Sequence, residues 1–141
     1  MCSSVTDNGI RGLLQLSLEV HMSSSFRDLR VWQEAMILTG RVYKITAEFP
    51  KTETYGLTQQ MRRAAVSVPS NIAEGKGHRS NKEFVHFLLH ARGSLWELQT
   101  QVLLAEQLLY TSSQESGLLL REAENVSRAL NGLITSLSTN V

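Results

Sequence analysis

The chain has 141 residues, 42% of them hydrophobic and 19% charged, and its 14 lysines and arginines exceed its 13 aspartates and glutamates by one charge. This is one ordinary globular domain, long enough to fold without disulfides or a metal. The single cysteine, Cys2, excludes a disulfide scaffold, and no apolar run approaches the roughly 18 residues of a membrane span. With only two prolines and nine glycines, the composition favours an all-α fold.

Residues 1–24 precede the periodic part of the chain. Their apolar stretch, Leu13–Leu18, is closed by Glu19, follows a single basic residue, Arg11, and has no small-residue cleavage site. These features argue against a signal peptide. We expect residues 1–24 to be a disordered leader or a miscalled start, with Met22 as the alternative first residue, and residues 25–141 to form one domain.

The first two periodic segments are separated by Pro50. The first begins near Ser25, which with Asp28 resembles a helix cap. The second contains Pro69, which predicts a kink near Ala65 or a restarted helix, and ends at Gly75–Gly77, where glycine suits a left-handed terminus. Apolar residues recur at steps of four and three, as in packed helices: Val31, Ala35, Leu38, Val42, Ile45 and Phe49, then Leu57, Met61, Ala64, Val68 and Ile72.

The third and fourth segments both open with a capping box, at Ser80–Glu83 and Ser112–Glu115. Short connections force consecutive helices to run in opposite directions. The sequence therefore predicts an all-α, antiparallel up-down-up-down four-helix bundle. The periodic residues are Phe84, Leu88, Ala91, Leu95, Leu98, Val102, Ala105 and Leu109, followed by Leu119, Ala123, Val126, Leu130, Leu133 and Leu137.

A second apolar stripe follows the third segment seven residues at a time, through Leu89, Trp96, Leu103 and Tyr110. In heptad terms it lies about 100° around the helix from the core line. A mostly polar strip separates the two lines, so one bundle core does not easily cover both. We predict an interface between subunits, where aromatic residues are favoured; the alternative is a wide buried face with partly exposed leucines.

No catalytic or metal-binding constellation emerges from the sequence. Glu83, His86 and His90 have the spacing of helical metal ligands, but their heptad positions point away from the bundle interior, which favours a solvated face. Ser67 and Ser70 lack the context of an activated serine. We therefore predict a protein that is not an enzyme and has no catalytic residues, metal or cofactor.

Charge is unevenly distributed along the chain. Residues 51–92 contain seven basic and three acidic residues, a net charge of +4, whereas residues 93–141 carry −3. Basic side chains gathered on one part of a fold can neutralise nucleic-acid phosphates. The alternative is a solvated face in which Arg62 or Arg92 pairs with Glu74 or Glu97. The candidate nucleic-acid-binding residues are Arg62, Arg63, Lys76, Arg79 and Lys82.

The stretch Gln60–Gly75, QMRRAAVSVPSNIAEG, strongly resembles the signature of the four-helix-bundle proteins first noticed in intervening sequences of bacterial 23S rRNA genes. The resemblance extends from about Phe26 to Leu137 and leaves out the leader. Shorter matches are Leu29–Trp32, Phe49–Pro50, Tyr55–Leu57, Lys82–Phe84 and Ala91–Leu95.

This resemblance implies a small cytoplasmic bacterial protein that assembles as a ring-shaped homopentamer and has no known enzymatic activity. A related branch of the family that the chain resembles serves as the accessory protein of diversity-generating retroelements. The resemblance therefore implies reverse transcriptase or another protein, and nucleic acid, as partners. Two functions compete: a ribonucleoprotein accessory module that binds RNA or DNA, and a protein-binding or structural scaffold without nucleic-acid contact. The charge asymmetry favours the first.

Overall fold

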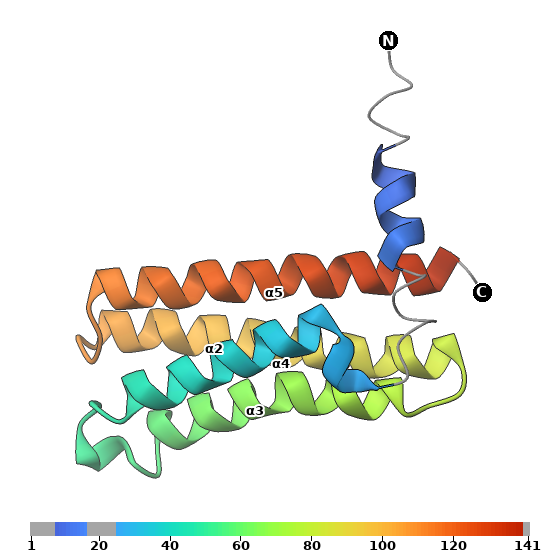
Figure 1. Cartoon of the computed structure of the whole chain (residues 1–141). Coiled ribbons are helices and arrows are strands. Elements are labelled where there is room, and N and C mark those ends of the chain that lie inside the picture. Colours follow the sequence, from blue (N-terminus) through green and yellow to red (C-terminus); the bar gives the residue numbers. More distant parts are fainter. Residues whose placement is uncertain (1–7, 17–24, 140–141) are drawn as a thin grey trace.

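A computed structural model describes residues 8–16 and 25–139 (Figure 1). The described residues form five α-helices and no strand, which confirms the all-α prediction. None of these helices has the length and apolar character needed to cross a membrane. They are residues 8–16, α2 (Arg30–Thr46), α3 (Leu57–Lys76), α4 (Asn81–Gln107) and α5 (Ser113–Thr139), with short 3-10 helices η1 (Phe26–Asp28) and η2 (Lys51–Glu53).

The four long helices lie side by side and are joined by short loops at alternate ends (Figure 1). Each contacts two of the others: α2 contacts α3 and α5, and α4 contacts α3 and α5, with the most extensive contact between α3 and α4. The helix at residues 8–16 is an additional element that stands at a steep angle to α5 (Figure 1). It is attached there by a hydrogen bond of 3.0 Å from the Ser136 hydroxyl to the Leu13 carbonyl. The rest of the predicted leader lies outside the described residues.

The core consists of the apolar residues that the four-three periodicity picks out. Ala35, Met61, Leu88 and Leu130, one from each long helix, have no exposed surface. Ile45 and Leu57 pack against this core while partly exposed. Leu109 is the one departure, since it is 88% exposed.

The structure explains why the periodicity fails at Leu109. Helix α4 ends at Gln107, and Leu109 adopts a left-handed conformation with φ of 62°. Its N–H donates to the Glu106 carbonyl at 3.0 Å, and the Tyr110 N–H donates to the Ala105 carbonyl at 2.9 Å. These two bonds are the Schellman pattern of a helix terminus. The heptad register of α4 therefore no longer predicts which residues are buried after residue 107.

Two predicted caps are confirmed and one is displaced. Ser80 and Ser112 each accept a backbone N–H three residues later, at 3.1 Å. Ser25, by contrast, accepts the Arg27 N–H and caps η1, whereas α2 begins only at Arg30.

Helix α3 decides part of its prediction at Pro69 and contradicts the one at Gly75. It continues from Leu57 to Lys76 through Pro69, so of the two predicted alternatives, a kink near Ala65 or a restarted helix, the restart is wrong. The described glycines all have negative φ, so the expected left-handed terminus at Gly75–Gly77 is also wrong. Gly75 is instead buried where α3 meets α4. A Cβ there would lie only 2.8 Å from the Phe87 Cβ, so the two helices approach each other too closely for a larger residue.

Candidate nucleic-acid interface

The five predicted nucleic-acid-binding residues fall into two groups on one helix and its turn. Arg62 and Arg63 lie in the second turn of α3, whereas Lys76 ends that helix and Lys82 lies at the start of α4. At 1.5 Å per residue, Arg62 and Lys76 are about 21 Å apart along the helix axis. The fold therefore gathers Lys76, Arg79 and Lys82 at the α3–α4 turn and keeps the arginine pair apart from them.

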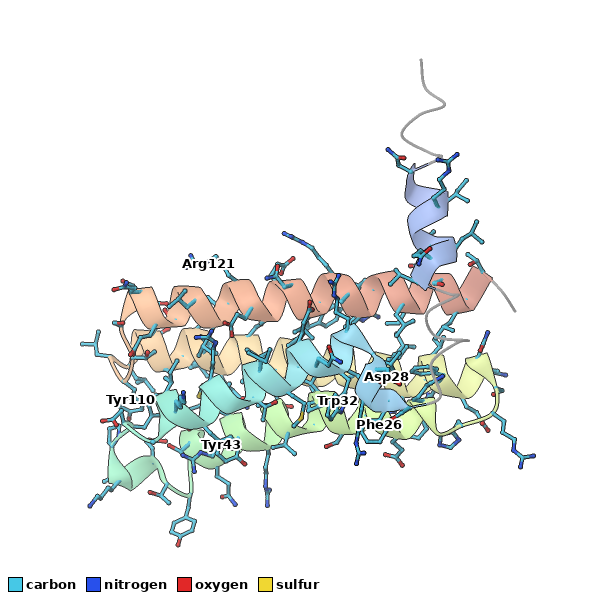
Figure 2. The ribbon with its side chains drawn as sticks, in the orientation of Figure 1. Phe26, Asp28, Trp32, Tyr43, Tyr110 and Arg121 are labelled. Atoms are coloured by element: carbon cyan, nitrogen blue, oxygen red, sulfur yellow. The ribbon has the colours of Figure 1, made fainter. Side chains whose placement is uncertain are left out.

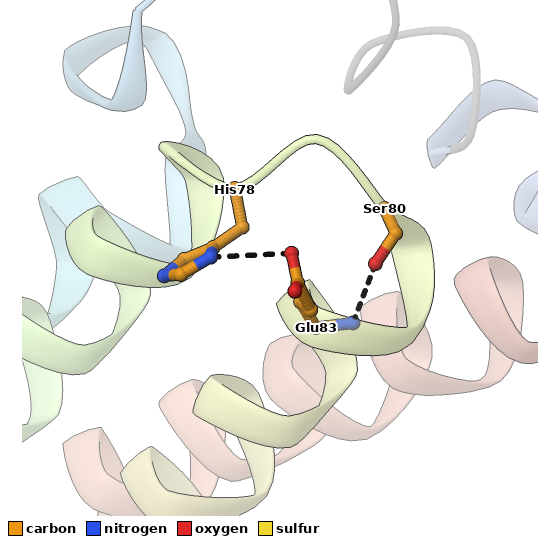
Figure 3. A network of polar contacts seen from close by, with 3 residues as sticks. All are labelled: His78, Ser80 and Glu83. Atoms are coloured by element: carbon orange, nitrogen blue, oxygen red, sulfur yellow. Dashed lines mark hydrogen bonds and ion pairs between the residues drawn. The ribbon is translucent and has the colours of Figure 1, made fainter.

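A small polar network organises the α3–α4 turn (Figure 3). The Glu83 N–H donates to the Ser80 hydroxyl at 3.1 Å, while the Glu83 carboxylate lies 3.2 Å from Nδ1 of His78. The side chain thus completes a contact with His78 rather than the reciprocal half of a capping box. The His78 ring also stacks on Phe87, with centroids 4.7 Å apart.

Arg79 and Lys82 project from this turn without a partner in the described part of the chain. Both side chains are exposed, and among the described residues neither forms a salt bridge or a side-chain hydrogen bond. The nearby Glu83 carboxylate is already in contact with His78. The two cations are therefore available to an external anion.

The arginine pair has two different environments. Arg62 is half-buried, and its Nε donates to the Thr46 hydroxyl at 2.9 Å instead of pairing with Glu74 or Glu97. Arg63 is exposed and has no ion pair within the described residues. Arg92 donates to the Asn131 side chain, so its predicted carboxylate pairing is also replaced.

The histidines of α4 lie on its solvent side, as predicted. His86 and His90 are both exposed, and their Nε2 atoms are 3.3 Å apart. Among the described residues, no group of three or more His, Cys, Asp or Glu side chains could hold a metal ion. Ser67 contacts the Ser94 hydroxyl at 2.8 Å, and Ser70 donates to the Val66 carbonyl, so both serines are used in helix contacts.

Three members of the second apolar stripe are exposed. Leu89, Trp96 and Leu103 have exposed fractions of 40%, 53% and 54%, and the Arg92 guanidinium lies over the Trp96 ring at 5.0 Å. Partly exposed leucines are also expected of a wide buried face, so these exposed fractions do not decide between that alternative and a subunit interface. Large apolar side chains exposed in a row are what an association surface requires.

Tyr110, the fourth predicted member, lies elsewhere because α4 has ended before it. Its ring packs against Phe49 at 5.6 Å, and its hydroxyl donates to the Glu53 carboxylate at 3.3 Å. Desolvation of the hydroxyl raises the pKa of Tyr110, and the negative charge of Glu53 and the hydrogen bond to it raise it further. Within the subunit, Tyr110 thus joins the end of α4 to the loop before α3 (Figure 2).

Sequence reasoning missed a hollow between α2, α3 and the loop before α3. It has a volume of about 600 Å³. The only sequence signal was an aromatic residue beside a loop glycine, Tyr55–Gly56, shortly before two arginines. We call this cavity the Tyr55 hollow. Its lining includes Tyr43, Tyr55, Thr58, Arg62, Arg63 and Ser67.

Comparisons with known proteins give one family. The chain is similar to a crystal structure of a protein of unknown function from the S23 ribosomal protein family of Bacteroides thetaiotaomicron, with a TM-score of 0.67 and 18% sequence identity. That match covers 74% of this chain and 97% of the other, and at this identity it shows a shared fold. No curated protein matches the chain. The family model described as 23S rRNA-intervening sequence protein matches residues 27–132, which is well over half of the chain, so the protein belongs to that family.

Proposed function

We propose that this protein is a non-enzymatic, oligomeric helical-bundle protein that binds RNA or DNA through the phosphate backbone, as a ribonucleoprotein accessory module. Its working unit is the antiparallel up-down-up-down bundle of α2–α5, with the helix at residues 8–16 outside it. A cytoplasmic location in a bacterium and a protein partner such as a reverse transcriptase belong to the same proposal.

The observation that carries this proposal is the pair of unpartnered cations at the α3–α4 turn. Arg79 and Lys82 are exposed, and the Glu83 carboxylate beside them is in contact with His78. Two free cations on a rigid turn can neutralise phosphates and release counterions, whatever the base sequence. Lys76 lies at the same turn, whereas Arg63 is a separate exposed cation near the start of α3.

Oligomerisation would strengthen a contact that is weak in one subunit. A symmetric assembly repeats the α3–α4 turn in every copy, so a second contact to the same strand becomes intramolecular. The exposed residues Leu89, Trp96 and Leu103 support such an assembly. We propose a homopentamer, since that is what the resemblance of the sequence implies.

The test is fluorescence anisotropy with a structured RNA and a duplex DNA at about 50 and 200 mM salt, the range in which counterion release is diagnostic. Binding should be indifferent to sequence and fall steeply with salt. Arg79→Glu with Lys82→Glu should weaken it and reduce the salt slope by about two, one for each lost phosphate contact. The matched control is Lys44→Glu with Arg121→Glu, which reverses two exposed cations on α2 and α5.

A second function, a scaffold without nucleic-acid contact, is favoured by the exposed second apolar stripe and the near-neutral net charge. The same experiment separates the two. An oligomer without salt-sensitive binding, or one whose binding survives reversal of Arg79 and Lys82, is a scaffold with a solvated basic face.

A further inference from the structure

The Tyr55 hollow has the size and the chemistry of a ligand site. Its volume of about 600 Å³ falls within the range of about 300–1,000 Å³ typical of small-molecule sites. Two tyrosine rings, hydroxyl groups and two guanidinium groups line it. A ligand that matches this lining has a flat ring, hydrogen-bonding edges and a negative charge.

Arg62 is fixed in this hollow by the fold itself. Its Nε donates to Thr46, its Nη2 donates to the Tyr43 carbonyl at 3.4 Å, and its guanidinium lies 4.6 Å from the centre of the Tyr43 ring. A guanidinium has five N–H donors, and these bonds use two of them. Within the described residues no acceptor takes the other three. Such a pre-positioned group binds an anionic oxygen at little entropic cost.

Tyr55 is presented to solvent by a rigid loop. It is 89% exposed, while the Gly56 N–H donates to the Glu53 carbonyl at 3.0 Å and a Glu53 carboxylate oxygen accepts the Leu57 N–H at 2.7 Å. A Cβ on Gly56 would lie 2.6 Å from that carboxylate oxygen, so a larger residue here would have to displace the Glu53 side chain from its bond to Leu57. The Tyr55 ring therefore adds almost no burial to the fold, yet its backbone position is defined.

Charge around the hollow favours an anion. Both oxygens of Glu53, the acidic residue of the loop, are used: one accepts from Leu57 and the other from the Tyr110 hydroxyl. Arg63 is exposed at the edge of the hollow without an ion pair in the described part of the chain. The two arginines thus outnumber this one carboxylate, and neither forms an ion pair with it.

We propose that the Tyr55 hollow binds one unpaired nucleotide of a single-stranded RNA or DNA segment. The base stacks on Tyr55, and its phosphate lies against Arg63 and the remaining donors of Arg62. Aromatic platforms beside basic groups hold single strands in this way, whereas the bases of a duplex are already stacked on one another. This inference rests on the proposed function, because it names the form of nucleic acid that the basic surface holds.

The experiment compares a labelled 12-nucleotide single strand with the matching duplex, by anisotropy at about 50 mM salt, where phosphate contacts are strong. Tyr55→Ala should weaken single-strand binding about tenfold, because stacking on one aromatic residue contributes that much or more. Duplex binding should stay within about twofold. Tyr55→Phe should restore single-strand binding, since the ring face is kept.

Two further variants separate this inference from the proposed function. Arg63→Ala should reduce the salt slope for the single strand by about one, whereas Arg121→Ala, on α5 away from Tyr43 in Figure 2, should not change it. Binding by the wild type with no effect of Tyr55→Ala would overturn the hollow and leave the proposed function standing. A wild type that binds neither form would overturn both. Circular dichroism confirms that each variant is folded.

Discussion

Gly75 sets how closely α3 approaches α4. The side chains of Phe84 and Phe87 occupy the space where a Cβ on residue 75 would stand, at 3.0 Å and 2.8 Å. The contact between these two helices is the most extensive in the protein. Glycine is required here by the closeness of the helices, while its backbone dihedral angles are accessible to any residue.

Gly75→Ala should therefore lower the free energy of unfolding by about 1–3 kcal/mol, the usual cost of overpacking. Gly40→Ala is the matched control, because Gly40 lies inside α2 and a Cβ added there would have nothing within 4 Å of it. Gly40→Ala should raise the free energy of unfolding by about 0.5–1 kcal/mol through helix propensity. Urea denaturation measures both, and equal effects would contradict the packing argument.

Tyr110 gives a pH dependence at the alkaline end. Its pKa lies above the ordinary 10.0 in the folded state, so the fold favours the neutral phenol. This stabilisation is fully present below about pH 10, the ordinary pKa, and is lost as the pH rises through the raised value. Tyr110→Phe should make the free energy of unfolding less dependent on pH above 10.

At the scale of elements, α3 tolerates Pro69 because another helix compensates for it. Proline has no N–H, so the Ala65 carbonyl lacks its usual donor four residues on. The Thr39 hydroxyl of α2 lies 3.0 Å from that carbonyl oxygen and 2.8 Å from the Ala35 carbonyl oxygen. The one hydroxyl hydrogen of Thr39 can be shared between these two carbonyls, and it thus offers Ala65 a donor in place of the one that Pro69 lacks.

A double-mutant cycle tests this compensation. Thr39→Val keeps the shape and removes the donor, and should cost about 1–2 kcal/mol in unfolding free energy, the penalty for an unsatisfied carbonyl. In the Pro69→Ala background the restored N–H can bond Ala65, so Thr39→Val should cost about 1 kcal/mol less there. Chemical denaturation of the four proteins gives the coupling, and additive effects would show that Thr39 does not compensate for Pro69.

Periodicity predicted the elements well because burial repeats with the helix. The lines through Val31, Leu88 and Leu130 are buried as expected. The periodicity failed at the end of α4, because no glycine or proline in the sequence marks that end. Leu109 takes the left-handed position that glycine usually holds. The misplacement of Tyr110 follows from the same cause.

At the scale of the whole molecule, the candidate site was only half predictable. Charge counting found Arg79 and Lys82, because a charge on an exposed turn is visible in the sequence. It could not show that Arg62 is held by Thr46 or that Tyr55 borders the same hollow. Those facts depend on how α2 lies against α3, and no local pattern records that.

The second apolar stripe leads to the last prediction, on assembly. Leu89, Trp96 and Leu103 are exposed on one line of α4, seven residues apart. If they form the seam between subunits, truncating Trp96 costs about 2 kcal/mol or more, and a charge at Leu103 costs further because it is buried without a partner. Trp96→Ala with Leu103→Asp should therefore shift the oligomer toward smaller species.

Light scattering across a range of protein concentrations measures this shift, with circular dichroism to confirm that the helices persist. The control is Ile37→Ala with Leu118→Asp, which changes two large exposed apolar residues on α2 and α5. A loss of about 2 kcal/mol raises each subunit dissociation constant about thirtyfold, so the effect grows on dilution. An unchanged mass in the folded Trp96 and Leu103 variant, or an equal loss in the control, would place the seam on another face of the protein.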